Sequence, residues 1–180
     1  MKTGLTRFCF TELNNLVGTI PTEIALLTGL KIWGMERGGL TGPIPTEVGL
    51  LQELIFIDLD FNQLTGSLSS EILSLRKLTQ LDLNDNRLTG SIEGIGGFPF
   101  MTFLQIHSNF FTGTVPQAVG TYANLTAFTL HETAVSGTMP DSVCRLLPSA
   151  NLGGNLTSLI ADCGGVDPDI VCDCCTSCRV

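Results

Sequence analysis

Cysteine has the clearest chemical potential in this 180-residue sequence, because six of its seven copies lie near the C-terminal end. These six are Cys144, Cys163, Cys172, Cys174, Cys175 and Cys178. Thiolates in Cys-x-x-Cys steps bind zinc, but the two steps present share Cys175 and no second pair follows at zinc-finger spacing. Six cysteines can also form three disulfides, and the choice between these chemistries depends on the compartment.

The two histidines of the chain offer a second possible metal site. His107 and His131 are 24 residues apart, and zinc could join them to Asn84, Asp85 or Glu132. Such a site needs a third good ligand, so polar surface residues are the favoured interpretation. A serine follows His107, but consecutive strand residues point to opposite sides of a sheet and no nucleophile motif surrounds the pair. We therefore expect no catalytic site, no bound metal and no cofactor.

A repeating framework must position these residues, because one short motif recurs along the chain. Its glycine stands at Gly18, Gly42, Gly66, Gly90, Gly113 and Gly137. The intervals are 24, 24, 24, 23 and 24 residues. Self-similarity at this period is typical of a solenoid, in which each repeat is one coil and neighbouring coils share a core.

Upstream of the glycine, the repeats follow the frame L-x-x-L-x-L-x-x-N, which is clearest in LTQLDLNDN at 78–86. The alternation predicts a short strand in each coil, and the stacked strands predict a continuous parallel sheet. The inward positions are Trp33 and Met35, Ile57 and Leu59, Leu81 and Leu83, Leu104 and Ile106, and Phe128 and Leu130. We expect Asn62, Asn86 and Asn109 to satisfy backbone groups at the bend after the strand.

The full motif, L-x-x-L-x-L-x-x-N-x-L-T-G-x-I-P, resembles the plant-type leucine-rich repeat of receptor-kinase ectodomains and polygalacturonase-inhibiting proteins. The tail, from LTSLIADCGG onward, is similar to the closing segment of secreted microalgal leucine-rich-repeat proteins. The resemblance implies an α/β solenoid, a right-handed superhelix of about six 24-residue coils with a parallel concave sheet. Residues 1–143 would form the solenoid, and 144–180 a disulfide-rich cap with a last irregular coil. Such repeats are binding scaffolds, not enzymes.

The resemblance also implies a compartment, since this family is extracellular. Glycosylation sequons at Asn124 and Asn155 agree with that location, and together they favour a disulfide cap over a zinc cage. We pair Cys144 with Cys163 and place two bridges within the tail, although the sequence leaves the connectivity open. The start, MKTGLTRFCF, has neither a secretory signal nor the paired-cysteine cap usual in the family. We expect either a truncated sequence or a rearranged gene, and an extracellular or cell-surface protein.

The first repeat is a degraded edge coil. It fits the frame with Thr6, Cys9 and Thr11 at the inward positions, followed by Asn14 and Gly18. Cys9 is the odd cysteine of the seven, and we expect it to be a free, buried thiol that behaves as a small hydrophobic residue.

The positions beside the inward residues form columns on the concave face, with acidic residues in the middle and aromatic residues beside them. The predicted ligand-binding residues are Phe56, Asp58, Asp60, Phe61, Asp82, Asn84, Asp85, Phe103, Gln105 and His107. Solvation alone explains an acidic surface. Three solvent-facing phenylalanines beside the acids are harder to explain that way, because aromatic anchors in a polar surround are typical of interface hot spots. A binding face is therefore the preferred interpretation.

The charge balance restricts the partner. The net charge is −8 and no basic run occurs, which disfavours nucleic acid and anionic membranes as partners. The apolar runs are too short for a membrane span. We expect a monomeric, non-enzymatic module that binds a protein or peptide ligand with basic groups.

Two other functions remain open. The family resemblance permits an inhibitor of a secreted glycan-degrading enzyme. A binder of ice or crystal surfaces is suggested by two columns of hydroxyl residues, although Pro43 interrupts one of them. The columns are Thr19, Ser67, Ser91, Thr114 and Thr138, beside Thr41, Thr65, Thr89 and Thr112.

Overall fold

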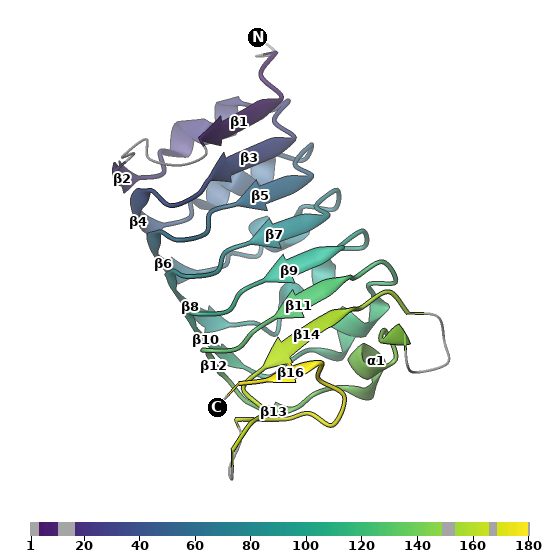
Figure 1. Cartoon of the computed structure of the whole chain (residues 1–180). Coiled ribbons are helices and arrows are strands. Elements are labelled where there is room, and N and C mark those ends of the chain that lie inside the picture. Colours follow the sequence, from purple (N-terminus) through teal and green to yellow (C-terminus); the bar gives the residue numbers. More distant parts are fainter. Residues whose placement is uncertain (1–3, 11–16, 149–153, 166–168, 180) are drawn as a thin grey trace.

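The computed structural model describes residues 4–10, 17–148, 154–165 and 169–179, and it shows a stack of coils (Figure 1). The larger sheet is parallel throughout and has the order β1-β3-β5-β7-β9-β11-β14-β16. Its strands are β1 (Arg7–Phe10), β3 (Ile32–Met35), β5 (Phe56–Asp58), β7 (Gln80–Asp82), β9 (Phe103–Gln105), β11 (Ala127–Thr129), β14 (Ser158–Ala161) and β16 (Ser177–Cys178). The predicted solenoid with its continuous sheet is confirmed.

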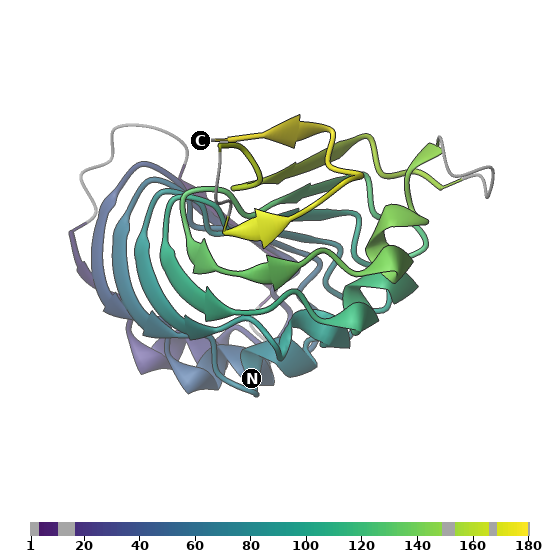
Figure 2. The ribbon, with the colours of Figure 1, turned by 90° about the horizontal axis from the view of Figure 1, so that it is seen from below.

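A second parallel sheet follows the first around each coil. Its strands are β2 (Val17–Thr19), β4 (Gly39–Pro43), β6 (Gln63–Ser67), β8 (Arg87–Ser91), β10 (Phe110–Gly113) and β12 (Ala134–Val135). Short helices form the return leg: the 3-10 helices η1 (Thr22–Leu26), η2 (Thr46–Leu50), η3 (Ile72–Ser74), η4 (Ile95–Gly97) and η5 (Gln117–Thr121), and then α1 (Asp141–Cys144). In the view along the stack, the larger sheet and the helices lie on opposite sides (Figure 2).

The core lies between these layers and is built from the residues that the repeat frame places inward. Leu81 is 1% exposed, and Trp33 and Leu104 are fully buried. Each coil alone would leave this apolar side in water, so stacking is what stabilises the fold. Among the described residues, no helix is long and apolar enough to cross a membrane.

The recurrent asparagine of the frame satisfies backbone groups at the bend, as predicted, and its bonds also join neighbouring coils. Asn86 accepts a hydrogen bond at Oδ1 from the backbone N–H of Leu64 (3.0 Å), and its Nδ2 donates to the carbonyl of Leu59 (2.8 Å). Asn62 and Asn109 make equivalent bonds. These side chains satisfy buried backbone groups at the bend, where the strand ladder ends.

The residue before the bend asparagine, or before its equivalent in the other coils, adopts a left-handed backbone conformation. The repeat motif does not reveal this conformation. Five non-glycine residues have positive φ angles between 48° and 54°: Arg37, Phe61, Asp85, Ser108 and Glu132. This conformation is uncommon for residues with a side chain. The conformation recurs at the equivalent position of five coils, just after the strand of the larger sheet.

The first coil differs from the predicted frame. The register pairs Phe8 with Trp33 and Cys9 with Gly34, and Phe8 packs against the core. Cys9 is free, as predicted, but it is exposed, and so is Thr6, so their inward placement was wrong. A phenyl ring gains more from burial than a thiol, which explains why Phe8 takes the inward position. Thr11 and Asn14 lie outside the described residues.

Three disulfides close the C-terminal end, but their pairing differs from our expectation. Cys144 bonds to Cys174 rather than to Cys163, Cys163 bonds to Cys178, and Cys172 bonds to Cys175. The reason is the path of the tail. Strand β16 pairs with β14, so Cys178 comes opposite Ala161 and within reach of Cys163. Strand β15 (Ile170–Val171) pairs with β13 (Gly137–Thr138), which brings the next cysteines toward the end of α1.

Candidate functional site

The strand register brings five of the predicted binding residues onto one side of the larger sheet, here called the concave face. Asp58 in β5 is the register partner of Asp82 in β7, and Asp82 is the partner of Gln105 in β9. Phe56 and Phe103 lie in the next row, with Gln80 between them. The intervening residues of the same strands are buried, so this side is the one that is open to a ligand.

Three carboxylates converge at the centre of the concave face. Each of Asp58, Asp60 and Asp82 places a carboxylate oxygen within 4.8 Å of the other two. All three side chains are half-buried. We call this group the acidic cluster.

Burial and mutual repulsion change the acidity of these groups. Burial, with the charge of Asp82 as the next cause, raises the pKa of Asp58 to about 7. Burial also raises the pKa of Asp82 to about 6, and Asp60 adds to that shift. The pKa of Asp60 is raised by burial and by Glu36, while Arg37 opposes the change. Removing carboxylates from water disfavours their charged forms, and neighbouring carboxylates add to the cost. The face is therefore most negative above neutral pH.

The three phenylalanines of the predicted site are not equally open. Phe61 is 45% exposed and lies under the guanidinium of Arg37, which is 5.0 Å from the centre of the ring. Phe56 and Phe103 are half-buried. Of the three, Phe61 offers the most apolar surface to a partner, and the cation above its ring fixes its orientation.

Asn84 links the acidic cluster to Gln105 of the next coil. The Nδ2 of Asn84 donates to Oδ1 of Asp82 (2.6 Å) and to Oε1 of Gln105 (3.2 Å). Asn84 is only 5% exposed, so it positions its neighbours more than it offers surface. Its Oδ1 has no hydrogen-bond partner among the described residues.

The two histidines, which hold equivalent places in neighbouring repeats, stack on each other. Their ring centroids are 4.4 Å apart and the planes are inclined by 14°. Nδ1 of His107 lies 2.9 Å from Oγ1 of Thr129, and Nε2 lies 4.0 Å from Oδ2 of Asp85. Burial, followed by the charge of His131, lowers the pKa of His107 to about 4. Burial also lowers the pKa of His131. Both rings are therefore neutral at pH 7.

The zinc site considered for these histidines is not assembled. Among the described residues, neither histidine belongs to a group of three His, Cys, Asp or Glu side chains with ligand atoms within 4.8 Å of one another. Glu132 instead accepts a hydrogen bond from the hydroxyl of Ser108 (2.7 Å).

Three residues near the site were missed as site residues in the sequence analysis. Glu36 and Arg37 act on the charge of Asp60, and Thr129 holds His107. Glu36 and Arg37 occupy the same columns as Asp60 and Phe61, one coil earlier. Extending each column by one coil beyond the predicted set would have found them.

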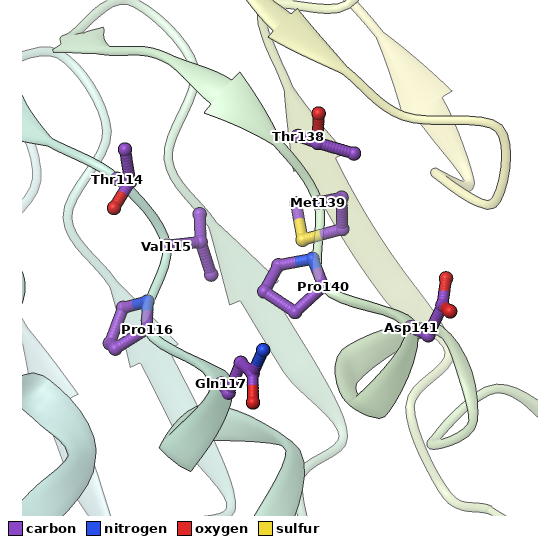
Figure 3. Close-up of a pocket in the computed structure, with 8 residues that line it drawn as sticks. All are labelled: Thr114, Val115, Pro116, Gln117, Thr138, Met139, Pro140 and Asp141. Atoms are coloured by element: carbon purple, nitrogen blue, oxygen red, sulfur yellow. The ribbon is translucent and has the colours of Figure 1, made fainter.

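The hydroxyl residues form exposed pairs on the second sheet, without a continuous ladder. Thr19 is in register with Thr41, and Ser67 with Thr89. Between these pairs, Thr65 lies beside Pro43 and Arg87. A depression next to this sheet is lined by parts of two successive turns (Figure 3). Its residues are Thr114, Val115, Pro116, Gln117, Thr138, Met139, Pro140 and Asp141.

Comparison with known proteins agrees with the repeat pattern. Residues 77–98 match the family model described as Leucine Rich Repeat. No curated protein matches the chain. Similar solved structures include PEPR1 bound to AtPEP1, with 30% identity over 88% of this chain and a TM-score of 0.74. The peptide hormone receptor RGFR1 in complex with RGF2 has 28% identity over 88% of this chain and a TM-score of 0.74.

A third similar structure is the ectodomain of the receptor kinase GASSHO1/SCHENGEN3 from Arabidopsis thaliana, in complex with CASPARIAN STRIP INTEGRITY FACTOR 2. It shares 26% identity over 81% of this chain, with a TM-score of 0.73. The present chain covers only 21%, 24% and 17% of these three structures, respectively. It therefore corresponds to a small part of each of these chains.

Proposed function

Because the chain is a plant-type leucine-rich-repeat protein, we propose that its concave face binds an extended peptide or protein segment with basic side chains. The proposal assigns no catalytic role to the chain. The observation that carries it is the acidic cluster next to the exposed ring of Phe61. The solved relatives support it, since RGFR1 is described as a peptide hormone receptor.

Charge is the first reason to expect a basic ligand. The three carboxylates of the acidic cluster lie together in the centre of the face, and Asp85 and Glu36 stand nearby in the neighbouring columns. A lysine or arginine side chain placed among them would regain in charge–charge attraction part of what the carboxylates lose by burial. The potential would also steer a cationic ligand toward the face.

Apolar contact is the second part of the proposed recognition. Phe61 supplies an exposed ring, and the half-buried Phe56 and Phe103 add apolar surface on either side of Gln80. Buried aromatic anchors surrounded by polar contacts dominate the affinity of many interfaces. The proposed ligand-binding set is therefore the predicted one, with Phe61 as its main anchor and Asn84 and His107 as supports.

The disulfide cap supports an extracellular compartment. Three disulfides persist in an oxidising environment, and the sequon residues Asn124 and Asn155 are both exposed. We therefore place the proposed binding event outside the cell or at its surface, with the sequons available for glycosylation.

A binding experiment tests the proposal. Peptides that bind the immobilised chain are selected from a random-sequence display library, and their association and dissociation are measured by surface plasmon resonance. We expect selected peptides to be rich in Lys and Arg. The double variant Asp58→Lys, Asp82→Lys should slow association and weaken its dependence on salt. Phe61→Ala should speed dissociation, with a cost of about 2 kcal/mol if Phe61 is a hot spot.

Leu50→Ala is the matched control, because Leu50 is an exposed apolar residue on η2, away from the larger sheet. It should leave binding unchanged. If both concave-face variants bind like the unmodified chain while their circular dichroism is also unchanged, the ligand does not use this face.

A further inference from the structure

The acidic cluster contains more oxygen atoms than the protein provides with partners. Asp58 and Asp82 are adjacent in the register, and Asp60 follows Asp58 by two residues, so three carboxylates share one small volume. Oδ1 of Asp60 is shut off from solvent and has no hydrogen-bond partner among the described residues. A buried hydrogen-bond acceptor without a partner costs free energy, so a ligand that contacts this oxygen would be stabilising.

A second oxygen at the same place is also without a partner. Asn84 is 5% exposed, and its Oδ1 receives no hydrogen bond from any described residue. Its Nδ2 donates to Oδ1 of Asp82 over 2.6 Å. Because Nδ2 and Oδ1 are bonded to the same carbon, the unpartnered Oδ1 of Asn84 lies next to the amide nitrogen that contacts Asp82. This neutral, buried side chain is not part of the carboxylate group, so it is independent evidence for a missing partner.

The protein has placed little positive charge here. Arg37 acts on Asp60, but its guanidinium lies over the ring of Phe61. Lys77 forms its ion pair away from the acidic cluster: its Nζ lies 2.6 Å from Oε1 of Glu53. Among the described residues, no lysine, arginine or histidine side chain forms an ion pair with Asp58, Asp60 or Asp82.

We infer that Asp58, Asp60 and Asp82, together with the amide oxygen of Asn84, form a binding site for a divalent cation, and that this cation is Ca²⁺. All four donors are hard oxygen ligands, and Ca²⁺ takes six to eight such ligands in a flexible geometry. Soft metals prefer sulfur or imidazole, which this group does not contain. Half-buried carboxylates leave one side open, where water can complete the coordination.

The site has a consequence for ligand binding, but it does not depend on it. A cation held here would neutralise the acidic cluster and compete with a basic side chain for the same oxygens. The test below contains no peptide, so its outcome is separate from that of the proposed function.

The experiment is a calcium titration of the whole disulfide-bonded chain after treatment with a chelator. Isothermal titration calorimetry should show one ion per chain, with a dissociation constant of about 10⁻³ M or tighter, as in extracellular calcium modules. The melting temperature should rise with the Ca²⁺ concentration, because the ion binds only the folded chain. Mg²⁺ should bind more weakly, since it demands a stricter octahedral geometry.

Asp60→Asn is the decisive variant, and Asp85→Asn is its matched control. Asp60→Asn keeps the shape of the side chain but removes one charged ligand, so calcium affinity should fall about tenfold or more. Asp85 is an acid of the same face outside the group of three, and its variant should keep the response. The inference is overturned if the unmodified chain binds no Ca²⁺ at millimolar concentration, or if the two variants respond equally.

Discussion

At the scale of single residues, the concave face holds groups whose protonation differs from that in water. His107 is the clearest example, because burial and the stacked ring of His131 lower its pKa to about 4. In the unfolded chain the pKa of a histidine is near 6.5. Between these two values the unfolded chain binds a proton and the folded chain does not. The stabilising effect of the neutral ring is therefore fully present above about pH 6.5 and is lost as the pH falls toward 4.

This difference predicts a pH-dependent effect of His107→Gln. Glutamine does not titrate and can still form a hydrogen bond with Thr129. The unmodified chain should lose more free energy of unfolding between pH 7.5 and pH 5 than the variant does, by about 1 kcal/mol after allowance for solvent screening. Urea denaturation at the two pH values measures this, and the carboxylates contribute equally to both proteins. Parallel pH profiles of the two proteins would contradict the predicted titration.

At the scale of the element, each strand is divided between a buried side and the concave face. Leu81 in β7 is 1% exposed, while the preceding Gln80 is half-buried on the concave face. Leu81→Ala should lower the free energy of unfolding by about 2 to 5 kcal/mol, because it leaves a cavity in a central coil. Gln80→Ala should change it by less than about 0.5 kcal/mol.

Chemical denaturation of the two variants measures this difference. Gln80→Ala is a close control for Leu81→Ala, because the two residues are neighbours in the same strand and face opposite sides of the sheet. Equal destabilisation by the two substitutions would be incompatible with the alternation described for β7.

At the scale of the whole molecule, the disulfides tie the last strands to the end of the stack. The bridge from Cys144 to Cys174 closes a separation of 30 residues, whereas that from Cys172 to Cys175 closes a separation of 3. In the chain-entropy account, a longer closed loop gives greater stabilisation. Replacing Cys144 and Cys174 by Ala should therefore lower the free energy of unfolding by about 3 kcal/mol, and replacing Cys172 and Cys175 by less.

Thermal unfolding of the two double variants, followed by circular dichroism, compares these effects. Peptide mapping under non-reducing conditions checks the pairing itself, and a peptide that joins Cys144 to Cys163 would contradict the structure. The opposite end of the stack has no disulfide among the described residues, and there the free Cys9 is exposed on β1.

The sequence by itself determined the coil, its period and the alternation of each strand. It also predicted that Asn62, Asn86 and Asn109 would satisfy backbone groups at the bend. These features repeat every 24 or 23 residues, and in a solenoid each coil interacts mainly with its neighbours, so local patterns carry through the whole stack. The same columns predicted that Asp58 and Asp82 would be adjacent. Only the first coil failed, because its strand lies one residue out of step with the others.

The tertiary structure decided what depends on distances and on solvent. It paired Cys163 with Cys178 because β16 pairs with β14, a contact that no repeat predicts. It buried Asn84 and left its Oδ1 without a partner, while Phe61 remained open in a left-handed backbone conformation. Spacing along a strand tells which side a residue faces, but not how far neighbouring side chains cover it. Burial and unmet hydrogen bonds arise from packing in three dimensions, and they set the acidity and the ligand preference of the concave face.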